Sequence, residues 1–458
     1  MQSSSSLLRL SAVISVLAVF CVVSDASAAT YTWISTTGSS WQTSENWSSA
    51  PTFDNQADVV FTSNLPIDGA FGRTYLGDAN RIVRSITFSS GTVAPLIATR
   101  ENANGVSVPR TLTLDTDSVG GNALVTIDAG AAAATIGGDG AIVLADNLVV
   151  GHNGSNTFSI NAPMSGAFNL TKNGSGTMVF QGGVTGTSRF AAYSGTTTIA
   201  AGTLKIGTGG SLGGLVGTTG ITGRSGAVLM IDRSNSVSQA TTGTQNSNIL
   251  NNQSITGGLG LTKAGSGTTT LSRVNTYTGP TLIEAGGLNL GANGSIANSS
   301  TITIGAGAAF NVASVSGGFA LSSGQTLGGK GTLAGNANFL NGSILAVDPL
   351  TSGTLATTGS LTFGNNFGIS NISVPSWNAL ATGTYTIVAG AQDFTTAGLQ
   401  NFGFNQKATV SGTQQAYFAA SGNNLQLVVV PEPATIALAV GGLVSVGFVG
   451  LRRLRRRG

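Results

Sequence analysis

The chain has 458 residues, of which 67 are glycine, 8% are charged and 6% are aromatic. Glycine and threonine weaken helices and favour turns or strands, so this composition excludes an ordinary helical or α/β enzyme and predicts an all-β protein. The formal charge of +3 is misleading, because five arginines lie at the extreme C-terminus. Between Ala29 and Val430 there are 14 basic and 15 acidic residues, which argues against a nucleic-acid partner.

Residues 1–28 have the features of a secretory signal peptide. Arg9 supplies the positive charge, and the run from Leu10 to Val23 is apolar and uncharged. Ala26 and Ala28 form a small-x-small cleavage site, which predicts that the mature chain begins at the next residue.

The only cysteine, Cys21, lies within this apolar run. Lipid attachment at Cys21 is disfavoured, because the bulky Phe20 precedes it where a small residue is expected. The mature protein therefore has no cysteine for a disulfide or for thiol chemistry.

Trp33, Trp41 and Trp47 lie within fifteen residues near the mature N-terminus. Their clustering has two interpretations. Pyranose rings pack on indole faces, so the cluster could bind sugar. The favoured interpretation is that residues 29–110 form a capping β segment, because a solenoid must close its first rung or expose an unpaired edge and core.

Short strands separated by glycine, asparagine and aspartate follow at near-regular spacing. This rhythm fits the rungs of a β-solenoid better than long hairpins, and it predicts a parallel β-helix-like solenoid over residues 111–349. The expected early strands are Ser85–Phe88, Thr111–Leu114, Ala123–Ile127 and Ile142–Val150.

An internal repeat organises the solenoid. LTKNGSGT at 170–177 matches LTKAGSGT at 261–268, and each copy continues through a Tyr-x-Gly corner, at Tyr193 or Tyr277, to an Ala-Gly turn and a closing strand. One copy cannot bury its own apolar face, so copies must stack. We expect threonine runs on the outer faces and one continuous core that includes Leu261, Leu271, Ile283, Leu288 and Leu290.

The pattern LTKxGSGT followed by NTYTG and Ala-Gly-Gly-Leu resembles the autotransporter-associated β-strand repeat. The resemblance covers residues 170–206 and 261–290, about a seventh of the chain. It implies extracellular β-helix architecture and carries little information about chemistry.

A more aromatic segment at 350–430, which includes Trp377 and Phe404, predicts a compact β-module at the far end. Its last strand is expected at Leu425–Val430. The chain then continues with Pro431, Glu432 and Pro433, an uncharged run over 434–451 that predicts one transmembrane helix, and a terminal basic cluster: Arg452, Arg453, Arg455, Arg456 and Arg457.

This three-part ending over 431–458 resembles the PEP-CTERM sorting signal. The resemblance implies that an exosortase processes the chain at Pro431–Pro433 and that the bacterium makes exopolysaccharide. Prolines lack a backbone donor and bias preceding residues toward extended structure, so the motif should stay outside the helix as an accessible peptide. An ordinary C-terminal membrane anchor is the alternative.

Motifs associated with catalysis lack their required context. Residues 209–213 match G-x-S-x-G, but no helix is expected after them. His152 is the only histidine, in a turn-like Gly-His-Asn-Gly setting. Residues 324–330 begin like a phosphate loop, yet Gly331 replaces the magnesium-binding Ser or Thr. Residues 137–140 resemble a calcium β-roll turn that does not recur, with Ile142 in place of the ligand aspartate.

Acidic residues are spread singly, apart from Asp115 and Asp117, which either share a cation or face solvent. A carbohydrate-binding or polysaccharide-cleaving β-helix, which would need clustered carboxylates, is therefore the second hypothesis. The first is a secreted structural or adhesive β-solenoid without enzymatic activity, cofactor or metal. It would be exported as an inner-membrane-anchored precursor and end at the cell surface or outside the cell, with exosortase, exopolysaccharide or other surface proteins as partners.

Overall fold

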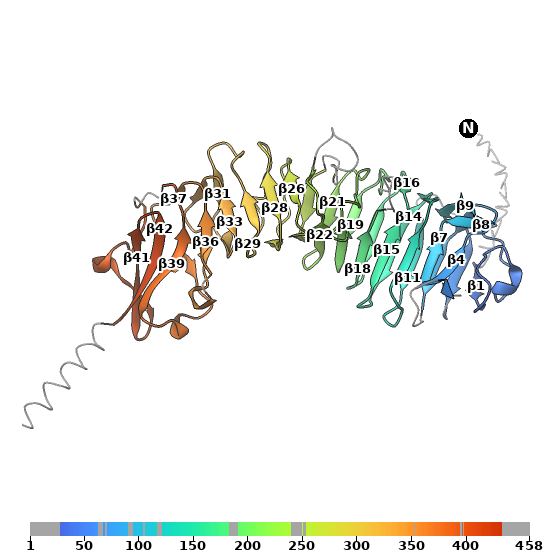
Figure 1. Cartoon of the computed structure of the whole chain (residues 1–458), viewed down its shortest axis with the longest axis horizontal. Helices are drawn as coiled ribbons and strands as arrows, with labels where there is room; N and C mark the ends of the chain where they lie inside the picture. Colours follow the sequence, from blue (N-terminus) through green and yellow to red (C-terminus); the bar gives the residue numbers. More distant parts are fainter. Residues whose placement is uncertain are drawn as a thin grey trace, which may run out of the picture.

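The computed structural model describes residues 28–62, 67–68, 71–89, 95–103, 106–116, 121–182, 191–239, 250, 253–351, 353–393, 396 and 398–432. These residues form an elongated stack of short strands that runs from β1 to β41 (Figure 1). In these described ranges, three long sheets and three small ones contain the strands, and the other regular elements are five 3-10 helices of one turn each. The prediction of an all-β protein with solenoid architecture is confirmed.

The nine-stranded sheet occupies one face of the N-terminal half. All its neighbours pair in parallel, as expected for successive turns of a solenoid. Its strands in spatial order are β1 (Ala29–Trp33), β2 (Ala57–Phe61), β6 (Ser85–Phe88), β11 (Asn122–Ile127), β14 (Asn147–His152), β17 (Leu170–Asn173), β19 (Thr197–Ile199), β21 (Ile221–Gly223) and β24 (Ile255–Gly257).

The fourteen-stranded sheet extends along nearly the whole stack. It is parallel except for its first pair, which forms a hairpin. Its strands are β3 (Ile67–Asp68), β4 (Phe71–Tyr75), β7 (Pro95–Ala98), β12 (Ala134–Gly137), β15 (Thr157–Asn161), β18 (Thr177–Phe180), β20 (Thr203–Ile206), β22 (Val228–Asp232), β25 (Gly260–Ala264), β27 (Thr281–Ile283), β29 (Thr301–Ile304), β32 (Thr326–Gly329), β35 (Ile344–Ala346) and β38 (Ile372–Ser373).

The ten-stranded sheet occupies the C-terminal half. It is parallel up to the β36–β39 pair and antiparallel beyond it, so a meander closes this end. Its strands are β23 (Val237–Ser238), β26 (Thr268–Leu271), β28 (Gly287–Leu290), β30 (Ala309–Asn311), β33 (Thr332–Ala334), β36 (Leu355–Thr357), β39 (Gly383–Ala389), β42 (Asn424–Pro431), β41 (Gln414–Ser421) and β40 (Ala408–Ser411).

The small sheets and one-turn helices complete the fold. One parallel sheet contains β5 (Arg81–Val83), β10 (Thr111–Leu114), β13 (Ala141–Leu144) and β16 (Met164–Gly166). Another contains β31 (Phe319–Leu321), β34 (Ala337–Phe339) and β37 (Leu361–Phe363), and β8 (Arg100–Ala103) forms a hairpin with β9 (Val106–Pro109). The helices are η1 (Ser44–Asn46), η2 (Pro349–Thr351), η3 (Ile369–Asn371), η4 (Trp377–Ala379) and η5 (Phe404–Gln406).

The hydrophobic core is one continuous cluster. Side chains on each strand alternate between the interior and the surface, so successive rungs stack their inward residues into one core. The prediction of a continuous core is confirmed, since the five named residues are all buried within it: Leu261, Leu271, Ile283, Leu288 and Leu290.

Two sequence expectations are corrected. Threonine runs do not lie wholly on the outer faces. Successive side chains of a strand point to opposite faces, so every second threonine of a run points inward. Thr197, Thr269 and Thr281 are fully buried for this reason. The expected strand at 142–150 is two strands, β13 and β14, separated by a turn at Asp146. Asp146 fixes this turn, because its buried carboxylate accepts two hydrogen bonds from Thr116: one from the backbone N–H (2.8 Å) and one from the side-chain hydroxyl (2.6 Å).

The predicted solenoid begins at residue 111 and ends at residue 349. Parallel strand pairing continues across both positions, through β5–β10 at the first and β35–β38 at the second.

Within the part of the chain that the structure describes, no helix combines the length and apolarity needed to cross a bilayer. The helix predicted over 434–451 and the arginine cluster after it lie outside the described residues, as do residues 1–27.

Candidate functional site

The Gly-Ser-Gly segment of each repeat forms a tight corner between two sheets. Gly174 and Gly265 have φ values of +76° and +70°, a conformation that residues with a Cβ rarely adopt. The second glycine of each corner has no room for a side chain: a Cβ on Gly267 would lie 2.2 Å from the carbonyl oxygen of Asn235. The repeated glycines therefore have a steric role.

A buried lysine closes the corner in the first copy. Period-two alternation places Lys172 on the same inward side as Leu170, and its side chain is fully buried. The Nζ atom donates to the carbonyl oxygens of Asn173 (2.9 Å), Gly174 (2.8 Å) and, on the next turn, Ala201 (3.2 Å). An ammonium has three donors, so all of them are used on backbone acceptors.

The second copy repeats this arrangement atom for atom. Lys263 is also fully buried, and its Nζ donates to the carbonyls of Ala264, Gly265 (2.8 Å) and Ala285 (3.1 Å). Burial lowers the pKa of both lysines to about 8. A lysine of lowered pKa can act as a nucleophile, but both amines are buried and hydrogen-bonded to backbone carbonyls. They therefore hold two turns together instead.

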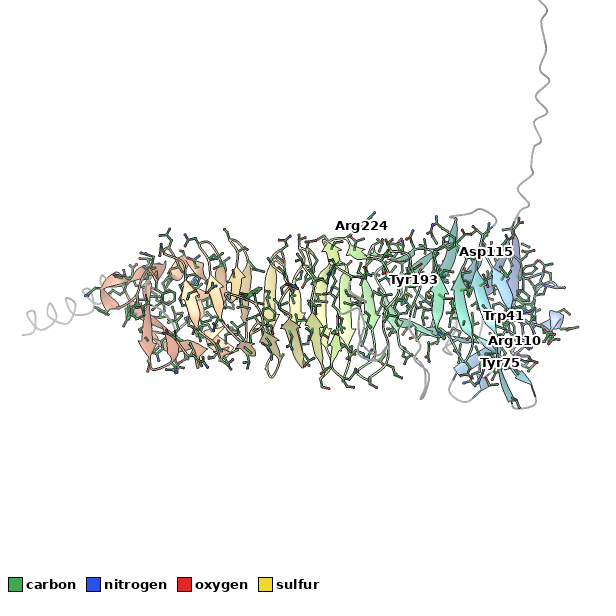
Figure 2. The ribbon with its side chains drawn as sticks, turned by 90° about the horizontal axis from the view of Figure 1, so that it is seen from above. Trp41, Tyr75, Arg110, Asp115, Tyr193 and Arg224 are labelled. Carbon is green, nitrogen blue, oxygen red and sulfur yellow. The ribbon has the colours of Figure 1, made fainter. Side chains whose placement is uncertain are left out.

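The Tyr-x-Gly corner contains a second buried polar network. Figure 2 shows Tyr193 in the body of the stack, where its hydroxyl shares a 2.6 Å hydrogen bond with Thr197 Oγ1. Thr197 also bonds Thr218, whose hydroxyl donates to the carbonyl oxygen of Gly195. Burial raises the pKa of Tyr193 well above its ordinary value. The phenol therefore remains a neutral structural group.

The second copy has the equivalent network. Tyr277 shares a 2.7 Å hydrogen bond with Thr281, and Thr281 shares a 2.8 Å bond with Ser299. Ser299 in turn donates to the carbonyl oxygen of Gly279. The residues that define the repeat thus serve the interior of the fold in both copies.

His152 is not in a turn but at the end of β14, where it is fully buried. A Cβ on Gly176 would lie 2.6 Å from its Nδ1, so the ring packs under the glycine corner of the next turn. Burial and the positive charge of Lys172 lower the pKa of the imidazole. An enclosed, neutral ring cannot serve as a base for an external substrate.

The G-x-S-x-G segment is a loop held by an arginine. The fully buried Arg233 donates from its guanidinium to the carbonyl oxygens of Ser211 and Gly213, and burial lowers its pKa to about 10. A nucleophile elbow needs a strand-to-helix turn with an exposed hydroxyl and a base. The segment here is followed by β21.

The other two glycine-rich motifs also have structural roles. Residues 326–329 form β32, so the segment that resembles a phosphate loop is an extended strand, and Lys330 Nζ donates to the carbonyl oxygen of Thr351 (3.3 Å). Asp139, in the segment that resembles a calcium turn, pairs with Arg100 at 3.4 Å and accepts a 2.6 Å hydrogen bond from Ser107.

Asp115 lies near the N-terminal end of the stack (Figure 2) beside the buried Asp146. Burial, then the charge of Asp146 and a hydrogen bond between the two carboxyls, raises the pKa of Asp115. Asp117 lies outside the described residues. Within those residues, no group of three or more His, Cys, Asp or Glu side chains is placed to hold a metal ion.

The three N-terminal tryptophans pack inside the first turn. Trp33, Trp41 and Trp47 are 1%, 0% and 3% exposed. Trp47 meets the other two edge to face, with ring centroids 4.9 and 5.4 Å apart, and Phe61 contacts all three. Their indole faces are covered by protein, so this geometry supports the capping interpretation.

A partly exposed tryptophan occurs at the other end. Trp377 borders a hollow of about 360 Å³ together with Ser370, Asn401 and Thr409. Asn401 already donates to the carbonyl oxygen of Gln406 and accepts from the backbone of Ile369, and the lining has no acidic residue. The grouping of aromatics with carboxylates that a polysaccharide-cleaving site needs does not occur in this hollow.

The proposed sorting motif begins inside the folded body. Pro431 ends β42, opposite Gln414 of β41. The N–H of Glu432 donates to the carbonyl oxygen of Thr413 (3.0 Å), and its carboxylate accepts from Thr409 Oγ1 (3.4 Å). Pro433 lies outside the described residues, as does Ala26 of the signal-cleavage site, whereas Ala28 directly precedes β1.

Comparison with protein families supports the repeat. Residues 170–206 and 261–290 match the family model described as passenger-associated-transport-repeat. Comparison with curated proteins gave no match, and comparison with solved structures gave none. The chain therefore carries an autotransporter-associated repeat within a β-solenoid.

Sequence reasoning did not anticipate that the repeated lysine and tyrosine are buried. A detectable signal was present: in both copies Lys follows Leu by two positions, so alternation puts both on one side of the strand. Arg233 had no such signal, because the turn that places it on the loop at 209–213 is known only from the structure.

Proposed function

We propose that this chain is a secreted, non-enzymatic β-solenoid that serves as a structural or adhesive component of the cell surface or extracellular matrix. The observation that carries the proposal is the use of the repeat's polar residues. Lys263 and Tyr277, like their counterparts Lys172 and Tyr193, are buried and bonded within the scaffold. The repeat thus supplies stacking surface instead of catalytic groups.

The proposal also includes export and processing. The signal peptide exports the chain, the helix at 434–451 holds a precursor in the inner membrane, and an exosortase acts near Pro431–Pro433 before the body reaches the surface or matrix with exopolysaccharide or other surface proteins. The support is the sequence of Pro-Glu-Pro, apolar run and arginine cluster in that order.

The test is to replace Pro431 and Glu432 together with alanine and to follow the protein in cell fractions. We expect an unprocessed precursor to accumulate in the inner membrane. Pro375→Ala, at an exposed proline in the same end of the molecule, is the control and should leave processing unchanged. Mass spectrometry of surface-localised protein that recovers intact Arg457 would exclude processing.

The absence of enzymatic activity is tested separately. Purified protein should not shorten any polysaccharide of the producing bacterium. Turnover that disappears on changing Asp115 or Asp117 to asparagine would replace this proposal with the polysaccharide-cleaving alternative.

A further inference from the structure

The terminal antiparallel sheet carries apolar side chains on part of its outward side. On β42, Leu425, Leu427 and Val429 are buried, which turns Val428 and Val430 outward. On the neighbouring β41, Tyr417 is directly opposite Val428 and lies on the same outward side. This side is mixed: Gln426 shares it with the two half-buried valines, and Thr384 and Gln415 lie directly opposite Val428 and Val430.

Phe404 extends this outward side. Its side chain is 59% exposed, and its ring meets Tyr417 edge to face with centroids 5.9 Å apart. Lys407 Nζ lies 3.4 Å from the centroid of the Phe404 ring. Lys407 is half-buried over this ring and, among the described residues, forms no ion pair with a carboxylate. We name Phe404, Lys407, Tyr417, Val428 and Val430 the terminal apolar face.

The chain leaves the folded body at the edge of this face. Period-two alternation places the Glu432 side chain on the same side as Val428 and Val430. The backbone bond to Thr413 and the carboxylate bond to Thr409 fix Glu432 against the β40–β41 hairpin. Only Pro433 separates this fixed point from the uncharged run that begins at residue 434.

We propose that the terminal apolar face rests on the surface of a phospholipid bilayer that contains anionic lipids while the precursor is anchored. This inference rests on the proposed membrane helix. A helix that starts two residues after Glu432 brings the adjacent sheet to headgroup depth, where aromatic rings are favoured. Lys407, which pairs with no carboxylate among the described residues, complements anionic headgroups. The contact would hold the processing motif at a fixed height above the membrane.

The proposal commits to the bilayer and not to a second copy of the chain, because the tail delivers this face to the membrane whatever else is present. It also differs from a sugar site, since Phe404 is the one fully exposed side chain of the face, the valines and Lys407 are half-buried, and none of its five residues lines the hollow beside Trp377. Docking of a second copy is an outcome that the test separates.

The test places tryptophan at the face in the chain from Ala29 to Gly458, reconstituted in nanodiscs of phosphatidylcholine and phosphatidylglycerol. Phe404→Trp is made in a Trp377→Phe background, so the other tryptophans are the three buried ones at the far end. Lipids brominated in the acyl chain should reduce the probe's fluorescence about twofold, since interfacial indoles reach that depth. Val274→Trp, at a mid-solenoid site that is 58% exposed, is the matched control and should be unaffected.

Insertion of the tail is measured in the same samples by protection of the arginine cluster from protease. An inserted tail without quenching at residue 404 overturns this inference and leaves the proposed function standing. A tail that does not insert overturns both. Quenching in the anionic discs supports the proposal if Lys407→Glu abolishes it. A fluorescence change that depends on the number of chains per disc, and not on bromination of the lipid, identifies docking of a second copy and overturns the proposal.

Discussion

Replacing Lys263 with methionine tests whether the buried lysine holds the repeat together. Methionine keeps the length and apolar stem of lysine but removes the ammonium. The carbonyls of Ala264, Gly265 and Ala285 then lose the donor that joins the corner to the following turn.

The expected loss follows from these three acceptors. A buried polar group left without its partner costs about 1–3 kcal/mol, so three carbonyls place the gross loss at roughly 3–9 kcal/mol. Removing the buried charge offsets part of this loss, because desolvation already lowers the pKa of Lys263 to about 8. We expect a net decrease of about 3 kcal/mol in the free energy of unfolding, within the range for breaking a buried polar network.

Urea unfolding followed by circular dichroism measures this difference. The control is Lys205→Met, which removes a lysine two turns before Lys263. The partner of Lys205 is the carboxylate of Asp232 at 2.7 Å, and both side chains are partly exposed. That pair should contribute no more than about 1 kcal/mol. Equal effects of the two substitutions would refute a structural role for the buried ammonium.

The pH dependence of the same comparison has a defined sign. The unfolded lysine keeps a proton up to its ordinary pKa near 10.5, whereas the folded one loses it near 8. The unfolded state therefore binds more protons between these values, and the native chain should gain stability relative to Lys263→Met as pH rises from 8 to 10. A constant difference across that range would show that the carbonyls hold the ammonium charged.

Three further substitutions test the other buried groups. Tyr277→Phe should cost about 1–2 kcal/mol by urea unfolding, because Thr281 keeps its bond to Ser299 but loses the one to Tyr277, whereas Tyr385→Phe, at an exposed hydroxyl, should cost almost nothing. Because the pKa of folded His152 is lowered, the unfolded chain takes up a proton at a higher pH than the folded one, and stability should fall as pH drops below 6.5. His152→Leu should flatten that part of the plot of urea midpoint against pH. The raised pKa of Asp115 implies a stability cost at neutral pH, so Asp115→Asn should raise the thermal midpoint at pH 7 and not at pH 3.

Local sequence pattern determines the strands well, because each rung depends on alternation over four or five residues. Ser85–Phe88 and Thr111–Leu114 were predicted with the bounds that β6 and β10 have in the structure. The expected strand at 142–150 failed where alternation continues through a corner. Asp146 makes that corner by bonding Thr116 on the preceding turn, a contact between residues 30 apart in the chain.

Buried polar groups were harder to predict than strands. A lysine or tyrosine in a strand ordinarily reads as exposed or amphipathic, and its burial depends on acceptors supplied by another turn. The carbonyl of Ala285 reaches Lys263 from 22 residues away. The motif at 209–213 shows the same limit, since only the stacking of turns brings Arg233 to it.

The two copies of the repeat occupy different faces of the solenoid. In the first copy the LTK segment lies in β17 of the nine-stranded sheet, and in the second it lies in β25 of the fourteen-stranded sheet. Following the pairing from β17 through β19 and β21 to β24 counts three turns, and one further face leads to β25. The second copy is therefore displaced by three turns and one face.

Both copies nevertheless make the same lysine and tyrosine networks, so these networks do not depend on a particular sheet. What they require is a corner: a glycine of positive φ, a following glycine without space for a Cβ, and an Ala-Gly turn on the next rung that offers a carbonyl to the lysine. The repeat thus makes the same corner at two places: between the nine- and fourteen-stranded sheets in the first copy, and between the fourteen- and ten-stranded sheets in the second.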